Sequence, residues 1–237
     1  MQPVVCETPA KLLWLEMKKA VSPFPKGVEE VPAPIRGTAF FPGGLGLWSE
    51  NGKPVEFPAG QIMIVGHDFN SKRAYEEAVE LGTEIDISRT WQVLRELLGN
   101  FGISPDRCFF TNVYMGLRQA EPETGTFPGA RDPNFVTRCV NFFKRQLEVA
   151  RPKLILTLGA APFRVLAKNF IIHETTPKTL TACSKIYTVS LGYGDATFVA
   201  LTHPSFYGMN VTRRRYGQLA GRDAEKAMIH EGLKRAF

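Results

Sequence analysis

The stretch Gln61-Ile62-Met63-Ile64-Val65-Gly66-His67-Asp68-Phe69-Asn70 decides the fold of this chain. It opens with a short, continuous apolar run and passes at once to glycine and to polar side chains. Such a run predicts a strand over residues 61–65 that is buried on both faces, which is typical of a parallel sheet covered by helices.

Beyond this strand, short apolar runs alternate with longer amphipathic segments. Strands are predicted over residues 107–113, 153–158, 186–190 and 197–202. Helices are predicted over residues 88–101, 133–150, 162–169 and a C-terminal segment ending near residue 237, and Asp132 is the predicted N-cap of the second. Strands that alternate with helices indicate an α/β fold with a mainly parallel sheet.

Residues 1–58 differ in composition from the rest of the chain. They contain nine of the 17 prolines, and their six basic residues balance six acidic ones. One helix is predicted after Thr8, which serves as its N-cap, with Pro9 at the first helical position. Because the apolar residues here keep no sustained period, we expect an N-terminal extension wrapped on a single domain formed by residues 59–237.

The composition is that of a folded globular protein, with 44% hydrophobic and 22% charged residues in a chain of 237. No apolar run approaches the ~20 residues of a membrane-spanning helix, and no basic segment leads into an apolar one after Met1. We therefore expect an intracellular protein without membrane contact. The four cysteines form no C-x-x-C pair and no zinc-type spacing, so we expect reduced thiols and no metal site.

The basic charge is concentrated near the C-terminus. The whole chain carries 29 Lys and Arg against 23 Asp and Glu, a net charge of +6, and residues 203–237 alone hold seven basic and three acidic side chains. A basic end of this kind is compatible either with binding of a polyanion such as nucleic acid or with an ordinary solvated surface.

Polar side chains follow three of the predicted strands. Asp68 comes shortly after the first strand, Asn112 lies at the end of the second, and His203 follows the last. In open parallel sheets, ligands bind beyond the carboxyl ends of the strands, so these residues are candidates for chemistry. Each also has an ordinary interpretation: Asp68 as a cap of a backbone amide, Asn112 as a link between loops, and His203 as a structural histidine.

Two further segments are candidates for binding. After His203 come the apolar side chains of Phe206, Tyr207 and Met209 and then three consecutive arginines at 213–215. Residues 116–133 form a long loop rich in glycine and proline, and loops of that length in compact domains are usually functional or disordered.

Together, these residues resemble the uracil-DNA glycosylase superfamily over residues 61–210. Gly66-His67-Asp68-Phe69-Asn70 is similar to its first motif, G-Q-D-P-Y in the best-known branch, and His203-Pro204-Ser205 resembles the start of its second motif, H-P-S-P-L. The middle section is similar to the iron-sulfur branch. It reads Thr111-Asn112-Val113, then Ala130-Arg131-Asp132-Pro133, then Cys139, then Arg151-Pro152-Lys153-Leu154-Ile155-Leu156-Thr157-Leu158-Gly159-Ala160-Ala161.

The resemblance implies a three-layer α/β/α fold around a mainly parallel four-stranded sheet. It implies a monofunctional DNA glycosylase, which flips uracil or another damaged or deaminated base out of DNA and hydrolyses its N-glycosidic bond in base excision repair. The implied partner is DNA, bound by a monomer.

The resemblance also implies roles for individual residues. Asp68 would face the sugar and orient the attacking water, and His203 would donate a hydrogen bond to the base oxygen. The expected base-binding residues are Gly66, His67, Phe69, Asn70 and Asn112. The expected DNA-binding residues are Ser205, Phe206, Tyr207, Met209, Arg213, Arg214, Arg215, Arg118 and Arg131.

The chain departs from the family pattern at three places. Gly116 stands at a cluster-ligand position of the iron-sulfur branch, and no C-x-x-C precedes the first strand, so we expect no cluster and no other cofactor. Phe69 replaces the usual proline, and Asn70 replaces the tyrosine that excludes the thymine methyl group, which leaves the selected base open. Residues 84–89 contain no counterpart of the aromatic that stacks on the flipped base, for which Phe69 or Tyr75 are substitutes.

Two other interpretations stay open. A nucleic-acid-binding protein that keeps this fold without activity would fit the altered first motif. A nucleoside- or nucleotide-processing enzyme on the same sheet would cleave free nucleosides and ignore duplex DNA.

Overall fold

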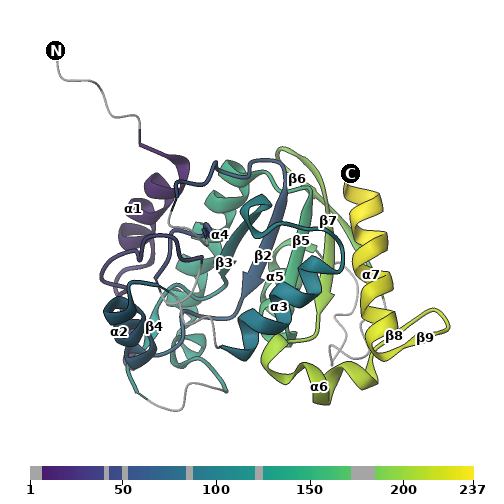
Figure 1. Ribbon diagram of the computed structural model, residues 1–237. Helices are drawn as coiled ribbons and strands as arrows, with labels where there is room; N and C mark the ends of the chain where they lie inside the picture. Colours follow the sequence, from purple (N-terminus) through teal and green to yellow (C-terminus); the bar gives the residue numbers. More distant parts are fainter. Residues whose placement is uncertain (1–6, 40–42, 50–52, 84–87, 121–124, 172–184) are drawn as a thin grey trace.

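The computed structural model describes residues 7–39, 43–49, 53–83, 88–120, 125–171 and 185–237 (Figure 1). At its centre, five strands form one sheet in the order β3-β2-β5-β7-β6. They are β2 (Ile62–Gly66), β3 (Cys108–Asn112), β5 (Leu154–Leu158), β6 (Tyr187–Leu191) and β7 (Gly194–Leu201). Neighbours among β3, β2, β5 and β7 are parallel, and β6 runs antiparallel to β7 at one edge.

The predicted α/β fold with a mainly parallel sheet is confirmed, and each predicted strand overlaps an observed one. The sheet differs from the implied four-stranded arrangement by the edge strand β6. Leu191 pairs with Gly194, so only Gly192 and Tyr193 connect β6 to β7. A two-residue link can join antiparallel strands but not parallel ones, and it sets the direction of β6.

The strands are buried on both faces because their side chains alternate between two hydrophobic clusters. In β2, Met63 and Val65 belong to one cluster, whereas Ile62 and Ile64 belong to the other. Successive side chains of a strand point to opposite faces, so both faces of this sheet are apolar and both need a helical cover.

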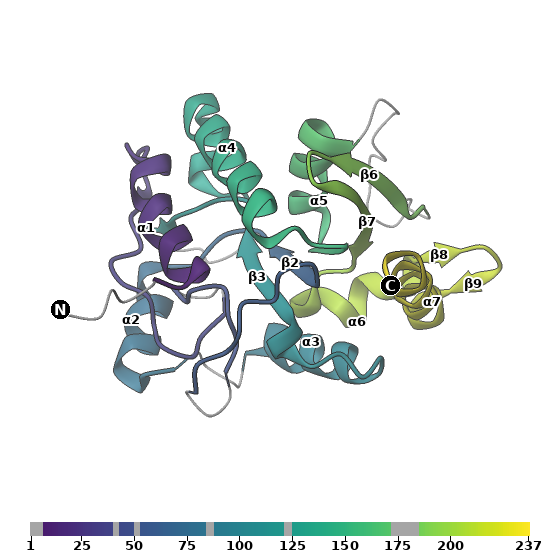
Figure 2. The same ribbon diagram turned by 90° about the horizontal axis from the view of Figure 1, so that it is seen from above.

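Helices supply that cover on both sides of the sheet, as Figure 2 shows. On the side of Met63 lie α1 (Pro9–Val21), α2 (Lys72–Leu81), α4 (Pro133–Ala150) and α5 (Ala160–Leu166). On the side of Ile62 lie α3 (Arg89–Gly99) and α7 (Gly221–Ala236). The shorter elements are β1 (Val28–Glu29), β4 (Leu117–Arg118), α6 (Tyr207–Asn210), β8 (Arg215–Tyr216), β9 (Leu219–Ala220), 3-10 turns at Pro105–Arg107, Pro128–Arg131, Pro204–Phe206 and Val211–Arg213, and a π turn at Ala167–Ile171.

Side-chain caps start three of these helices. The predicted N-caps are confirmed: Thr8 accepts a hydrogen bond from the backbone N–H of Lys11, and Asp132 accepts two from the start of α4. Helix α2 is absent from the sequence prediction. It has the same kind of start, because the Ser71 hydroxyl accepts from the N–H of Ala74, and it ends at Gly82 with φ 68°.

The N-terminal segment is held to the rest of the domain at three places. Helix α1 packs on α4. Strand β1 pairs antiparallel with β4, and the carbonyl of Gly46 accepts a hydrogen bond of 2.8 Å from the N–H of Phe110 in the outer strand β3. The division of the chain at residue 58 stays a prediction.

Arg214 is fully buried, which excludes the predicted contact with DNA. Its guanidinium donates to the carbonyl of Ala200 in β7, and its Nε lies 3.1 Å from Oε2 of Glu225 in α7. Glu225 in turn accepts hydrogen bonds from the backbone N–H and the hydroxyl of Thr202. This ion pair attaches α7 to the end of β7.

Replacing Arg214 by methionine would leave the Glu225 carboxylate buried and unpaired. We expect Arg214→Met to lower the free energy of unfolding by about 3–5 kcal/mol, the usual effect of removing one partner of a buried pair. The exposed neighbour provides the control, since Arg213→Met keeps the pair. Urea unfolding followed by circular dichroism measures both, and equal stabilities would contradict the structural role of Arg214.

Candidate active site

A cavity of about 680 Å³ opens at the carboxyl ends of the parallel strands. Asp68 after β2, Asn112 at the end of β3 and His203 after β7 all line it. The rest of the lining comes from the loop after β2, from α2 and the start of α3, from Arg118 and Gly125, from residues 158–162 at the junction of β5 and α5, and from Ser205 and Phe206 after His203. The three residues that the strand-end rule predicts therefore meet in one cavity, whose volume lies within the range of ligand pockets, roughly 300–1,000 Å³.

The Asp68 carboxylate is surrounded by donors. Oδ1 accepts from the N–H of Asn70 at 2.8 Å and from Nε of Arg118 at 3.3 Å, and Oδ2 lies 2.8 Å from Nη2 of Arg118 and 2.8 Å from Nδ1 of His67. Burial by itself would raise the pKa of Asp68, but His67 and Arg118 outweigh it and lower the pKa below its ordinary value. Asp68 is therefore a fixed negative charge at the cavity wall.

Arg118 reaches Asp68 from β4 and is only 3% exposed. Its guanidinium also donates to the carbonyls of Gly125 and Thr126 and lies over the ring of Phe127. Arg118 lines the cavity, but its buried charge is committed to Asp68 and to the loop beside it, which does not support the predicted contact with the DNA backbone.

His203 is held as a hydrogen-bond donor to the cavity. Its Nδ1 accepts from the N–H of Ser205 at 3.2 Å, so in the neutral ring the proton lies on Nε2. Burial lowers the pKa of His203 from 6.5 to about 4, with a contribution from nearby His67. Gly159, at φ +95°, permits this position, since a Cβ there would lie 3.1 Å from the Cβ of His203.

The loop that carries His203 is attached on both sides of the imidazole. Before it, Thr202 is bound by the buried Glu225. After it, the hydroxyls of Ser205 and Thr90 in α3 form a hydrogen bond. The hydroxyl of Ser205, predicted to contact DNA, thus bonds to α3, while its N–H orients His203.

Other predicted base-binding residues also line the cavity, namely Gly66, His67, Asn70 and Asn112. Asn112 is fully buried. Asn70 has φ 66°, a left-handed conformation that asparagine tolerates better than most residues. Its side-chain oxygen is buried and has no hydrogen-bond partner within the described part of the chain.

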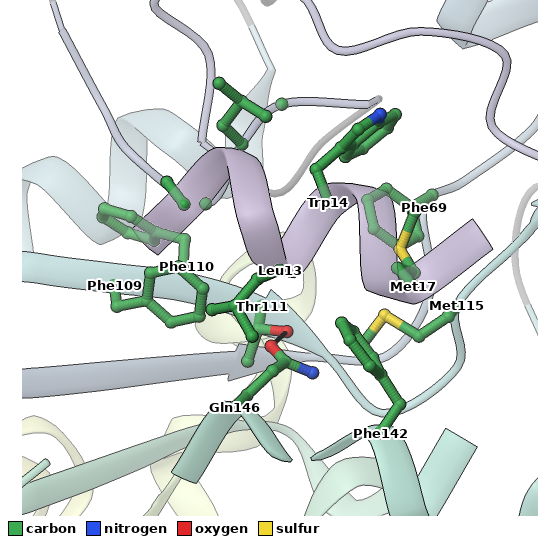
Figure 3. A pocket seen from close by; sticks show the side chains of 14 residues that line it. Leu13, Trp14, Met17, Phe69, Phe109, Phe110, Thr111, Met115, Phe142 and Gln146 are labelled. Carbon is green, nitrogen blue, oxygen red and sulfur yellow. Dashed lines mark hydrogen bonds between the residues drawn. The ribbon is translucent and has the colours of Figure 1, made fainter. Parts of the chain in front are cut away.

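Phe69 and Tyr75 do not stack beside this cavity. Phe69 lines a separate pocket of about 30 Å³, where Figure 3 shows its ring next to Trp14 and Met17 of α1. The prediction that Phe69 binds the base is therefore wrong. Tyr75 is buried in the same core, and its hydroxyl bonds to the backbone of Ala33. Residues 84–87, part of the segment without a stacking aromatic, lie outside the described residues.

The predicted DNA-binding side chains divide by exposure. Phe206 is 41% and Met209 68% exposed, and Arg131, Arg213 and Arg215 are exposed as well. Tyr207 is buried, with the Arg222 guanidinium 5.6 Å from the centre of its ring. Burial excludes Tyr207 as a wedge into DNA.

Sequence reasoning missed several parts of the site. Arg118 was predicted for another role, and Thr90 and Trp91 carry no local signal that would place them at the cavity. Gly159 could have been found, because it follows directly on the predicted strand 153–158 and the strand-end rule applies to it as well.

The low pKa of His203 has a consequence for stability. In the unfolded chain this imidazole takes a proton near 6.5, whereas in the folded protein it does so only near 4. Between these values the unfolded state binds more protons, so the free energy of unfolding falls as the pH drops through this window. We expect His203→Gln to reduce that pH dependence and His230→Gln, on the exposed face of α7, to retain it. Urea unfolding across the window measures this, and an unchanged dependence in His203→Gln would contradict the burial of a neutral ring.

Comparison with known proteins agrees with the fold. A family model described as the uracil DNA glycosylase superfamily matches residues 58–226, and the chain belongs to this superfamily. The chain is also similar to a Type-4 uracil-DNA glycosylase from Archaeoglobus fulgidus, with 27% identity over 128 residues. This match covers 53% of the present chain and 59% of the relative, so it spans little more than half of either protein.

The described residues do not fit an iron-sulfur cluster. A Cβ at Gly116, the expected ligand position, would lie 2.6 Å from Cγ1 of Val28, so the N-terminal segment fills that place. Cys139 and Cys108 are free and lie in the two different hydrophobic clusters, and burial raises the pKa of each thiol to about 12. Cys6 and Cys183 lie outside the described residues.

Two other features are absent from the described residues. No group of three or more histidine, cysteine, aspartate or glutamate side chains is arranged to hold a metal ion there. No helix in those segments is long and apolar enough to span a membrane.

Proposed function

We propose that this protein is a monofunctional DNA glycosylase, which hydrolyses the N-glycosidic bond of uracil or another damaged or deaminated base flipped into the cavity. The observation that carries the proposal is the convergence of an ionised carboxylate, Asp68, and a neutral imidazole, His203, on one cavity. The name of the Archaeoglobus relative makes uracil the first base to test.

The chemistry needs two opposite charges to be stabilised. As the bond breaks, the sugar gains positive charge, as in other glycosyl hydrolyses, and the base leaves with the electron pair. The negative charge of Asp68 would face the sugar. The Nε2–H of His203 would donate to the base oxygen that takes up negative charge, and one such preorganised donor is worth roughly 10²- to 10³-fold in rate.

A base can enter the cavity only after its nucleotide is extruded from the DNA. Extrusion costs a few kcal/mol, and this energy is smallest for a damaged or mismatched base. Phe206 and Met209 are exposed on the segment that follows His203, and they would fill the gap in the stack. Arg213 and Arg215 would contact phosphates without reading sequence. Asn112 and Asn70 would read the edge of the base, and Arg131 would lie on the DNA backbone.

Three further parts of the proposal concern the setting of the reaction. We propose that the enzyme acts as a monomer, inside the cell, in base excision repair. Superfamily membership and the basic C-terminal segment support DNA as the partner.

The glycosylase proposal is tested by base release from oligonucleotides that carry uracil, hypoxanthine, xanthine or mismatched thymine. We expect the wild type to release at least one of them and Asp68→Asn to slow the single-turnover rate by roughly 10²-fold or more. The matched control is Asp106→Asn, which changes an exposed carboxylate just before the start of β3, at the end of the strand away from the cavity. Salt-dependent DNA binding without any base release would instead support the inactive nucleic-acid-binding protein.

The proposed DNA contacts are tested by affinity at several salt concentrations. We expect Arg213→Gln and Arg215→Gln each to weaken the binding of all DNA sequences to the same extent. Each should also reduce the magnitude of the slope of log affinity against log salt concentration by about 1, the value for one lost phosphate contact. Arg151→Gln serves as control, because Arg151 is exposed before β5, at the amino ends of the strands and thus away from the cavity. Equal slopes in all three variants would contradict a phosphate contact at 213 and 215.

A further inference from the structure

The Asp68 carboxylate has no acceptor position left for a water molecule. An ionised carboxylate offers about four lone-pair sites on its two oxygens. Here four donor contacts occupy them: the N–H of Asn70, Nε and Nη2 of Arg118, and Nδ1 of His67. A saturated carboxylate with a lowered pKa is also a poor acceptor for the proton of an attacking water.

His67, in contrast to Asp68, has an acceptor position that is open to the cavity. Its side chain lines the cavity and is 20% exposed, and Nδ1 lies 2.8 Å from Oδ2 of Asp68. Next to a carboxylate, the proton of a neutral imidazole is favoured on Nδ1, which leaves Nε2 as a lone-pair acceptor. Nε2 has no hydrogen-bond partner within the described part of the chain.

Aromatic neighbours set the plane of this imidazole. Tyr114 meets it edge-on at 5.2 Å between ring centres and 79°, and Phe127 does so at 6.4 Å and 79°. Phe127 also carries the Arg118 guanidinium over its ring, so the same side chain supports both partners of Asp68.

We infer that His67 is the general base of the reaction: its Nε2 takes the proton of the attacking water, and Asp68 orients its ring. This inference rests on the proposed glycosylase function. The water oxygen forms a bond to C1′, the N-glycosidic bond breaks, and its electron pair leaves with the base. The water proton passes to Nε2, and the imidazolium so formed is paired with Asp68.

The charged and titratable groups around His67 are compatible with this role. Asp68 on the same loop is ionised and lies against Arg118 from β4. Tyr114 faces the ring, and His203 from the loop after β7 is near enough to interact electrostatically. Arg73 and Glu77 of α2, which are paired with each other, line the same cavity. Since His203 is uncharged above about pH 4, it does not oppose the positive charge that His67 gains.

The first test uses the free wild-type protein and needs no activity. Nitrogen-15 chemical shifts of the four imidazoles, assigned with one His→Gln variant at a time, report which nitrogen of each ring is protonated. We expect opposite tautomers in the cavity, with the proton on Nδ1 of His67 and on Nε2 of His203. A proton on Nε2 of neutral His67 would overturn the inference.

The second test is the pH profile of single-turnover base release on the base that the wild type releases fastest. A base must be unprotonated, so we expect the wild-type rate to fall as the medium becomes acidic. We expect His67→Gln to be slower by about 10²- to 10⁴-fold and to lose that acidic limb. His230→Gln is the matched control and should keep both the rate and the limb.

The outcomes separate this inference from the glycosylase proposal. An active wild type whose acidic limb persists in His67→Gln overturns the role of His67 and leaves the enzyme a glycosylase. A wild type that releases no base overturns both. Thermal melting of His67→Gln shows whether the variant is folded when its rate is measured.

Discussion

The ion pair between Arg118 and Asp68 is the interaction on which the candidate site depends. Both side chains are almost completely buried, and buried charges are tolerated only when they are paired and hydrogen-bonded. The backbone continues the same attachment, because the N–H of Arg118 donates to the carbonyl of Asn70 at 2.7 Å. The loop after β2 is therefore fixed to β4, and β4 is fixed to β1 of the N-terminal segment.

A second buried arginine acts in a similar way on the other side of the cavity. Arg214 pairs with Glu225, whose carboxylate binds Thr202 directly before His203. Both loops that carry candidate catalytic residues are thus held by a buried arginine, directly in the case of Asp68 and through Glu225 in the case of His203. This arrangement favours a site whose geometry is set before a ligand arrives, which is what electrostatic stabilisation of a transition state requires.

The strands and the predicted helix caps were predictable because their signals are local. Apolar runs placed the strands, and Thr8 and Asp132 were recognisable as N-caps from their neighbours alone. The strand-end rule was enough to bring Asp68 and His203 to the cavity, since it depends only on the direction of parallel strands.

The errors concern residues whose position depends on distant partners. Three consecutive arginines look alike in sequence, and only Glu225 decides that the middle one is buried. Arg118 is buried because it pairs with the carboxylate of Asp68, 50 positions earlier in the chain. Phe69 lies just after β2, and its ring packs in the same cluster as the apolar face of α1. No local sequence pattern connects Phe69 to α1, so the direction of its ring could not be predicted.

The hydrogen bond from the N–H of Phe110 to the carbonyl of Gly46 protects an edge of the sheet. β3 is the outer strand of the sheet, and an uncovered outer strand offers free backbone groups that can pair with another molecule and start aggregation. The segment around Gly46 covers part of this edge, and its left-handed φ of +77° lets the backbone approach so closely that a Cβ would lie 2.5 Å from the Phe109 ring. A shortened protein that begins after this segment would expose that edge to self-association.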